Sequence, residues 1–253
     1  MNIQLIRNAT LIVNYAGKKF LIDPFLAEKG VYPPFPNSAR QDQHNPLQNL
    51  PVPINDIIDH IDAVIVTHLH LDHWDDTAKE VLPKHVKLFT QNEEDANKVR
   101  SAGFQHVEVL QEDTVFEGIQ LTKTKGEHGR GDLVNLMGHV SGVVFKHQEE
   151  KTLYIAGDTV WYQSVEETIH THNPEVIVVN AGANQLLEGG PIIMDKEDVY
   201  EVHQATPTAT IMAVHMEAAN HWGLSRQELR RFAAEKDFSS QLLVPEDGEA
   251  YTL

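Results

Sequence analysis

The segment Thr67-His68-Leu69-His70-Leu71-Asp72-His73 limits the fold of this chain more than any other stretch, because its ligand-type side chains must meet at one place. It continues directly from residues 63–67, a short β-branched run that predicts a buried strand. His68 and His70 are two residues apart, so on an extended backbone their side chains project to the same side. Strand and motif together predict a strand end that presents imidazoles to a common space.

Asp72 and His73 fall on the turn into the next predicted helix, from which they reach the same space from another direction. A polar turn with solvated histidines is the alternative, and for a single histidine it would be preferred. Four such side chains interleaved with the apolar Leu69 and Leu71 instead predict a metal site. Imidazole and carboxylate ligands suit zinc, manganese or iron(II), and the residues alone leave that choice open.

Cysteine is absent, which excludes a disulfide framework, a thiolate metal site and a cysteine nucleophile. Of the 253 residues, 41% are hydrophobic and 23% charged, an ordinary globular composition that can close a core without a metal. We expect a single domain over residues 1–253. Residues 24–53 carry prolines and aromatics without periodicity, so we expect an active-site lid inserted there.

The formal net charge of −17 argues against a nucleic-acid partner, because phosphate binding depends on clustered Lys and Arg. A small anionic substrate remains compatible, since bound divalent cations would be the largest local charges at their site. No apolar run approaches the ~20 residues that span a bilayer, and the N-terminus shows no signal-peptide pattern. We therefore expect a cytoplasmic protein with a small-molecule substrate and no membrane partner, and a homo-oligomer remains open.

Strand-like and helix-like segments alternate in both halves of the chain, which predicts an α/β fold with two face-to-face sheets and helices outside. The strands are predicted at residues 10–15, 19–22, 63–67, 86–90, 107–109, 120–125, 140–146, 152–156, 176–180 and 209–214. The helices are predicted near residues 74–82, 92–102, 163–172, 195–204 and 225–234.

The order His-x-His-x-Asp-His after a strand that ends in Thr resembles the signature of the metallo-β-lactamase superfamily. Further positions agree with this resemblance in sequence order and extend it over nearly the whole chain. They are Leu21-Ile22-Asp23-Pro24, His128 in Gly126-Glu127-His128-Gly129, Gly157-Asp158-Thr159, and His215. The helix start at Met194-Asp195 resembles the branch that contains ascorbate-6-phosphate lactonase.

The resemblance implies a four-layer αβ/βα sandwich that holds two divalent metal ions at one edge, between the sheets. The implied ligands are His68, His70 and His128 for the first ion, Asp72, His73 and His215 for the second, and Asp158 between them. Zinc or manganese is favoured over iron, because the flavodiiron relatives typically carry Glu at the position of His70. Asp23 is expected to hydrogen-bond one of the ligand imidazoles.

Two of these ligands have rivals nearby in the sequence. His139 competes with His128, but it stands at the head of a strand pattern. His221 competes with His215, which directly ends an apolar strand and is preferred because strand ends hold ligands rigidly. His221 is then either a proton donor, an oxyanion partner or a satisfied polar group.

This set of residues implies a metal-dependent hydrolase in which a metal-bound hydroxide opens a small lactone, ester or phosphodiester. Asp72 or His221 would return a proton to the leaving group, and a metal-bound Asp72 would be the poorer acid because its pKa would be lowered. Arg130 is a candidate contact for an anionic substrate group, and Trp161 and Tyr162 are candidates for the pocket wall. The alternatives are an iron-dependent redox enzyme with the same ligands and a non-catalytic metal-binding sensor.

Overall fold

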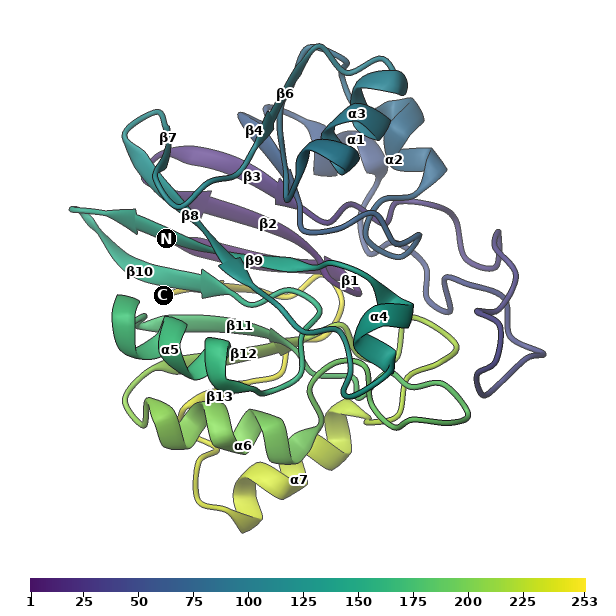
Figure 1. Ribbon diagram of the computed structural model, residues 1–253, viewed down its shortest axis with the longest axis vertical. Helices are drawn as coiled ribbons and strands as arrows, with labels where there is room; N and C mark the ends of the chain where they lie inside the picture. Colours follow the sequence, from purple (N-terminus) through teal and green to yellow (C-terminus); the bar gives the residue numbers. More distant parts are fainter.

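Two seven-stranded sheets lie face to face in the computed structural model, which describes residues 1–253, and helices cover the outer face of each sheet (Figure 1). In spatial order the first sheet consists of β14 (Ala250–Thr252), β1 (Asn2–Arg7), β2 (Thr10–Tyr15), β3 (Lys18–Ile22), β4 (Ala63–Val66), β5 (Lys87–Thr90) and β6 (His106–Val109). The second consists of β13 (Leu242–Leu243), β12 (Thr210–Val214), β11 (Val176–Asn180), β10 (Glu150–Ile155), β9 (Ser141–His147), β8 (Ile119–Lys125) and β7 (Thr114–Phe116).

The helices divide between the two outer faces (Figure 1). On the side of the first sheet lie α1 (Ile54–Ile58), α2 (Asp76–Val81) and α3 (Glu93–Ser101), and on the side of the second lie α5 (Gln163–His172), α6 (Lys196–Ala205) and α7 (Arg226–Glu235). The short α4 (Leu133–Met137) precedes β9 at the end of the sheets. None of these helices combines the length and apolar character that crossing a membrane requires.

Buried apolar side chains form three layers that hold the elements together. The middle layer fills the space between the sheets, with Phe20 and Phe89 from the first sheet against Phe145 and Val178 from the second. The other two lie between each sheet and its helices. The architecture is therefore the predicted four-layer α/β sandwich.

Parallel strand pairing brings the candidate site residues to one edge of the molecule. β10, β11 and β12 run parallel to one another, so their carboxyl ends share an edge of the second sheet. In the first sheet β3 and β4 are also parallel neighbours. Side chains that directly follow these strands can therefore meet between the sheets, as is general for parallel α/β sheets.

Every predicted strand and helix is present, with bounds shifted by a few residues. α2 begins later than predicted because the Asp75 side chain accepts from the N–H of Ala78 and caps the helix there. The elements that were not predicted are β1, β7, β13, β14, α1 and α4. Most are too short to show a periodic pattern, whereas in β1 the buried Ile3 and Leu5 alternate with polar residues as a strand requires.

Candidate active site

The motif that follows β4 folds back on itself within a single turn. The backbone N–H groups of His73 and Trp74 both donate to the carbonyl of His70, at 2.9 Å. The ring centroid of His68 lies 4.5 Å from that of His70 and 4.1 Å from that of His73. His68, Asp72 and His73 are buried and His70 is partly exposed, so the motif presents its ligand atoms to one interior space.

Three side chains enter the same space from the second sheet. Asp158 follows β10, Asn180 ends β11 and His215 follows β12. Asn180 donates from Nδ2 to Oδ1 of Asp158 at 2.6 Å, which orients the carboxylate. Oδ2 of Asp158 then lies 3.2 Å from Nε2 of His73 and 3.8 Å from Nε2 of His68. The two sheets therefore contribute opposite walls of one cluster.

His128 reaches the cluster on the loop between β8 and α4. The N–H of Glu127 donates to Oγ1 of Thr159, which ties this loop to the residue after Asp158. Nδ1 of His128 donates to the carbonyl oxygen of Ile192 at 2.7 Å, because that oxygen can only accept. Nε2 of His128 is consequently left with a free lone pair, 3.5 Å from Oδ2 of Asp158.

The side chains thus gathered form three overlapping groups, and within each group the ligand-type atoms lie within 4.8 Å of one another. The groups are His68, His70 and His128; His68, His73 and Asp158; and Asp72, His73 and His215. Together they contain every metal ligand that the sequence pattern and the family resemblance suggest, drawn from separate stretches of the chain.

The hydrogen bonding inside the cluster suits divalent cations. Nδ1 of His73 is hydrogen-bonded to Asp23, and Nε2 of His73 lies 3.1 Å from Nε2 of His215. Nε2 of His68 is buried with no hydrogen-bond partner. Buried polar atoms are rarely left unpaired, and converging imidazole nitrogens beside two carboxylates are the ligand set that zinc-type ions bind. The residues present therefore fit metal ions.

Asp23 holds His73 from the side opposite the cluster. Oδ1 of Asp23 accepts from the N–H of Thr67, and Oδ2 accepts from the Thr67 hydroxyl, both at 2.7 Å. Oδ2 also lies 2.9 Å from Nδ1 of His73. These contacts place the carboxylate beneath the imidazole, in the supporting position that a ligand histidine usually requires.

The two carboxylates of the cluster stay ionised. Burial alone would raise the pKa of Asp158, but His73 and His215 beside it lower that pKa well below its ordinary value. Burial also opposes ionisation of Asp72, and the contact with His215, at 3.2 Å, outweighs it and lowers the pKa of Asp72. Asp72 is therefore the poorer of the two expected proton donors.

His221 lies beside the metal-type groups without belonging to them. Its Nε2 is 3.2 Å from Nδ2 of Asn184, which also lies 3.3 Å from Nδ1 of His215. Its Nδ1 is buried without a partner. Burial lowers the pKa of His221 to about 4. At neutral pH the ring is therefore uncharged.

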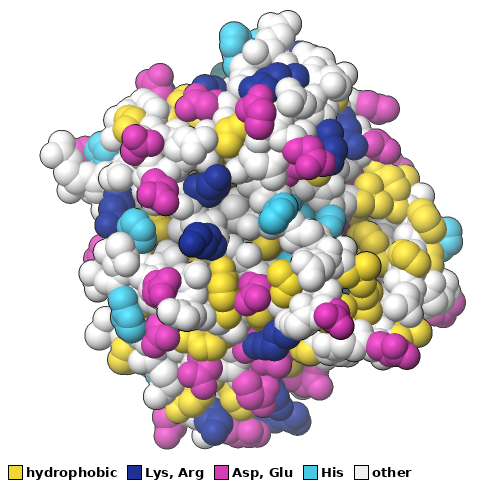
Figure 2. All heavy atoms as spheres, viewed as in Figure 1, with side chains coloured by type: hydrophobic (Ala, Val, Ile, Leu, Met, Phe, Trp, Pro, Cys, Tyr) yellow, Lys and Arg dark blue, Asp and Glu magenta, His cyan; other side chains and the backbone are white.

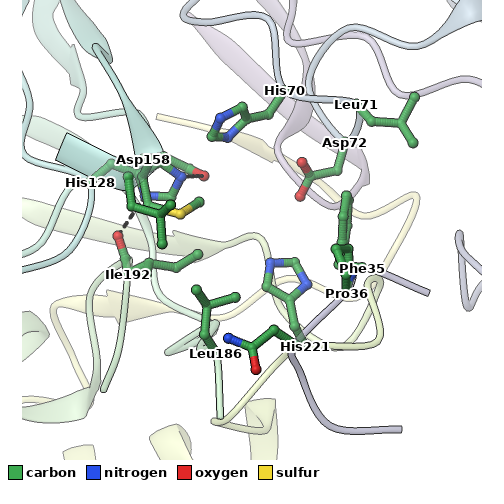
Figure 3. Close-up of a pocket in the computed structure, with 13 residues that line it drawn as sticks. Phe35, Pro36, His70, Leu71, Asp72, His128, Asp158, Leu186, Ile192 and His221 are labelled. Atoms are coloured by element: carbon green, nitrogen blue, oxygen red, sulfur yellow. Dashed lines mark hydrogen bonds and ion pairs between the residues drawn. The ribbon is translucent and has the colours of Figure 1, made fainter. Parts of the chain in front are cut away.

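A cavity of about 430 Å³ opens onto the cluster, a volume within the range of small-molecule sites. Figure 3 shows His128 and Asp158 on the left of the cavity, His70 at its top and Asp72 on its right, with His221 below Asp72. The remaining wall is largely apolar and is made by Phe35, Pro36, Leu71, Leu136, Met137, Leu186 and Ile192. No Lys or Arg lines the cavity, so the chain offers no cationic side chain to an anionic substrate there.

Apolar side chains are also exposed on this side of the molecule. Leu136 and Leu187 are each 68% exposed, and Val31 is 56% exposed. Figure 2 shows apolar side chains gathered at the flank where Figure 1 places residues 24–53. This segment, the expected lid, contributes Phe35, Pro36 and Asn37 to the cavity.

The structure does not bring the expected substrate contacts into the cavity. Arg130 is exposed, and its guanidinium pairs with Asp198 at 2.6 Å. Trp161 and Tyr162 pack against the apolar layer under the second sheet's helices. His139 is exposed outside the cluster, so it is no rival to His128.

Asparagine side chains are the part of the site that sequence reasoning missed. Asn180 and Asn184 contact Asp158 and His215, and Asn8 lies 3.3 Å from Nε2 of His215. Of these, only Asn180 could have been recognised from the sequence, because it ends an apolar strand and Asp158 closely follows another. The others sit in loops, where polar residues are expected without a special role.

Comparisons with known proteins agree with this geometry. A family model described as a beta-lactamase superfamily domain matches residues 18–216. UPF0173 protein YddR of Bacillus subtilis is 66% identical over 253 residues, which is 100% of both chains. The crystal structure of an isothiocyanate hydrolase from Delia radicum gut bacteria is 45% identical, with a TM-score of 0.96 over 100% of this chain and 99% of that one. A possible metal-dependent hydrolase from Veillonella parvula is 40% identical, with a TM-score of 0.97 and the same coverage.

Proposed function

The chain belongs to the metallo-β-lactamase superfamily and is a metal-dependent hydrolase of the UPF0173 family, and from this premise we propose that it hydrolyses small, neutral, largely apolar electrophiles, with isothiocyanates as the first class. The observation that carries the proposal is the cavity, whose polar side holds the His/Asp cluster and whose other walls hold apolar side chains without Lys or Arg. The isothiocyanate hydrolase at 45% identity supports the choice of substrate class.

We propose that the cluster binds two divalent ions. His68, His70 and His128 would hold one, Asp72, His73 and His215 the other, and Asp158 would lie between them. When bound, such ions supply a water of lowered pKa and polarise the bond that is attacked. Asp23 and Asn180 would keep His73 and Asp158 in position, since their hydrogen bonds are already formed.

For an isothiocyanate, the reaction adds the oxygen of water to the central carbon of R–N=C=S and a proton to the nitrogen. The C–N bond of the resulting thiocarbamate then breaks with transfer of the second proton to nitrogen, which yields an amine and carbonyl sulfide. We propose that the His221 ring, which lines the cavity, donates a hydrogen bond to the atom that gains negative charge. A neutral imidazole can do this in a buried site, because it orients a dipole there without a net charge.

The apolar wall also bears on the other substrates suggested by the sequence. A lactone or an ester is neutral and fits the same walls, so both stay in the test. A phosphodiester or a phosphorylated lactone carries negative charge, which only the metal ions could meet in this cavity. We also propose that residues 1–253 act as one catalytic domain, because the apolar layer between the sheets joins both halves of the chain.

The test combines metal analysis with a substrate panel. Purified protein is reconstituted with zinc or manganese, measured by plasma emission, and assayed with 2-phenylethyl isothiocyanate, an aryl ester, a lactone and a phosphodiester. We expect two ions per chain, amine release from the isothiocyanate, and a loss of at least about 10³-fold in Asp158→Asn. Turnover by a colourless zinc or manganese enzyme would exclude the iron alternative. Full metal loading without amine release would overturn the substrate class, and less than one ion per chain would overturn the mechanism.

A further inference from the structure

Asn220 joins the loop after β12 to the segment 24–53. It lies between His215 and His221 in sequence and is fully buried. Every polar group of Asn220 is hydrogen-bonded, and every partner belongs to the segment 24–53. Its side-chain Oδ1 accepts from the N–H of Phe35 at 2.8 Å and from Nδ2 of Asn45 at 3.0 Å. Its Nδ2 donates to Oγ of Ser38 at 2.9 Å and to the carbonyl of Ala39 at 2.7 Å. Its backbone N–H donates to Oδ1 of Asn45 at 2.8 Å, and its backbone carbonyl accepts from Arg40 at 3.0 Å.

Near the cavity the segment is otherwise held by the hydrogen bonds that Ser38 and Gln41 make to Phe35 and by few contacts with the rest of the molecule. It contains no helix or strand, and its one isolated bridge pairs Tyr32 with Asn45. The guanidinium of Arg40 adds a contact with the ring of Trp222, 3.9 Å from the centroid. The N–H of Leu187 donates to the carbonyl of Asn37. Because the backbone lacks a ladder of hydrogen bonds, the conformation of this segment depends on side chains such as Asn220.

The segment in turn forms part of the reacting end of the cavity. The ring of Phe35 packs edge-on against His221, with centroids 4.7 Å apart and planes at 71°. Figure 3 shows Phe35 and Pro36 beside His221, under Asp72. Asn220 accepts a hydrogen bond from the N–H of Phe35. The position of the Phe35 ring therefore depends on the residue that directly precedes His221 in the sequence.

We propose that Asn220 is a positioning residue that fixes Phe35 against His221 and thereby sets the width of the cavity. The expected effect on substrate preference rests on the proposed function, whereas the expected effect on the conformation of the segment does not. Only an amide supplies both roles, because its oxygen accepts from Phe35 and its nitrogen donates to Ala39. An aspartate of the same shape keeps the acceptor, loses the donor and sets a charge against the Ala39 carbonyl.

The first experiment measures hydrogen–deuterium exchange of residues 33–46 in the full-length, metal-loaded protein. We expect Asn220→Asp to speed exchange of this segment at least tenfold and to leave the sheets unchanged. Ser38→Ala removes one bond to Asn220 together with the bond from the Ser38 hydroxyl to the Phe35 carbonyl. It leaves the other partners of Asn220 in place and should give a smaller increase in the same peptides, which keeps the test open if Asn220→Asp folds poorly. Asn97→Asp, on the exposed surface of α3, is the matched charge control. Exchange of residues 33–46 within twofold of wild type in both variants would overturn the proposal.

The second experiment compares a narrow and a wide substrate, methyl and 2-phenylethyl isothiocyanate. Release of Phe35 should widen the cavity, so Asn220→Asp and, more weakly, Ser38→Ala should shift the ratio of kcat/KM toward the wide substrate. At unchanged metal content we expect Asn220→Asp to shift this ratio tenfold or more, mainly through a higher KM for the narrow substrate. An unchanged ratio would overturn the assignment of specificity. If the wild type turns over neither compound, the proposed function fails while the exchange measurement still decides whether Asn220 fixes the segment.

Discussion

Single residues in this site have roles that follow from their partners. The carboxylates of Asp72 and Asp158 stay ionised because imidazoles surround them, and His221 stays neutral because it is buried. We propose that this neutral ring, at the wall of the cavity, complements charge that develops on a substrate. The difference in charge thus distinguishes the carboxylates that we propose as metal ligands from His221, which we propose contacts the substrate.

Replacement of His221 tests that separation. His221→Gln keeps a polar side chain beside Asn184 but removes the imidazole from the cavity. We expect kcat to fall about 10²-fold with the metal content unchanged, because one preorganised hydrogen-bond donor is lost. The measurement is steady-state kinetics together with plasma emission. A fall in rate matched by a loss of metal would assign His221 to the metal site instead.

The lowered pKa of His221 also predicts how stability depends on pH. The ring has a folded-state pKa of about 4, below its ordinary 6.5, so the unfolded chain binds a proton that the folded chain does not. Folding stability from this group is therefore intact above about pH 6.5 and is lost as pH falls toward 4. Urea unfolding of the metal-free protein should show a shallower decline over this range in His221→Gln than in the wild type. Parallel declines would contradict the assigned protonation state.

Among the elements, the ends of parallel strands decide where the site residues lie. β4 leads into the histidine motif, and β10, β11 and β12 lead to Asp158, Asn180 and His215. The turn after β12 is tightly constrained, since His215 has a φ of +59° and its carbonyl packs against Gly182. Such backbone strain persists where surrounding structure holds it and is frequent at functional sites.

Gly182 is accordingly a position where the smallest substitution should disturb the site. A Cβ there would lie 2.2 Å from the carbonyl oxygen of His215. We expect Gly182→Ala to destabilise the protein by about 1–3 kcal/mol and to weaken metal binding, because the loop that carries His215 must shift. Urea unfolding and metal titration measure the two effects.

Gly190→Ala is the control for this substitution. Its φ of +82° makes an alanine strained, but a Cβ there meets nothing within 4 Å. The control should therefore lose some stability through its own backbone and keep its metal affinity. Equal metal affinity in the two variants would refute the prediction for Gly182.

For the whole molecule, the fold and the metal-type cluster are separable. Three apolar layers hold the sheets and helices together, and the cluster lies at one edge of the middle layer. A domain of this size buries enough apolar surface to fold without a metal ion. Bound ions then add stability only through their preference for the folded state.

Removal of metal should therefore lower the melting temperature without unfolding the protein. At a metal concentration about 1,000 times Kd each bound ion contributes about 4 kcal/mol, which corresponds to roughly 10 °C per ion for a chain of this length. The check is thermal unfolding by circular dichroism before and after chelation, with re-addition of zinc. Loss of secondary structure at 25 °C on chelation would show that folding depends on the metal.

Local sequence patterns were enough to predict the α/β architecture and the core of the candidate ligand set. The pattern of apolar strands is local, and His68, His70, Asp72 and His73 lie in one segment, so spacing alone revealed them. The remaining candidate ligands, His128, Asp158 and His215, are each isolated in the sequence, and the resemblance to a known family selected them. Asp158 and His215 are brought together by the parallel pairing of β10, β11 and β12, which local sequence patterns do not reveal.

The character of the cavity became visible only once the chain was folded. Arg130 looked available for an anionic substrate, but it pairs with Asp198, a partner 68 residues away in the chain. Phe35 and Asn220 looked like ordinary loop residues, yet they meet across 185 residues and shape the wall beside His221. Contacts of this kind depend on how loops from distant elements pack together, and no local pattern in the sequence encodes that packing.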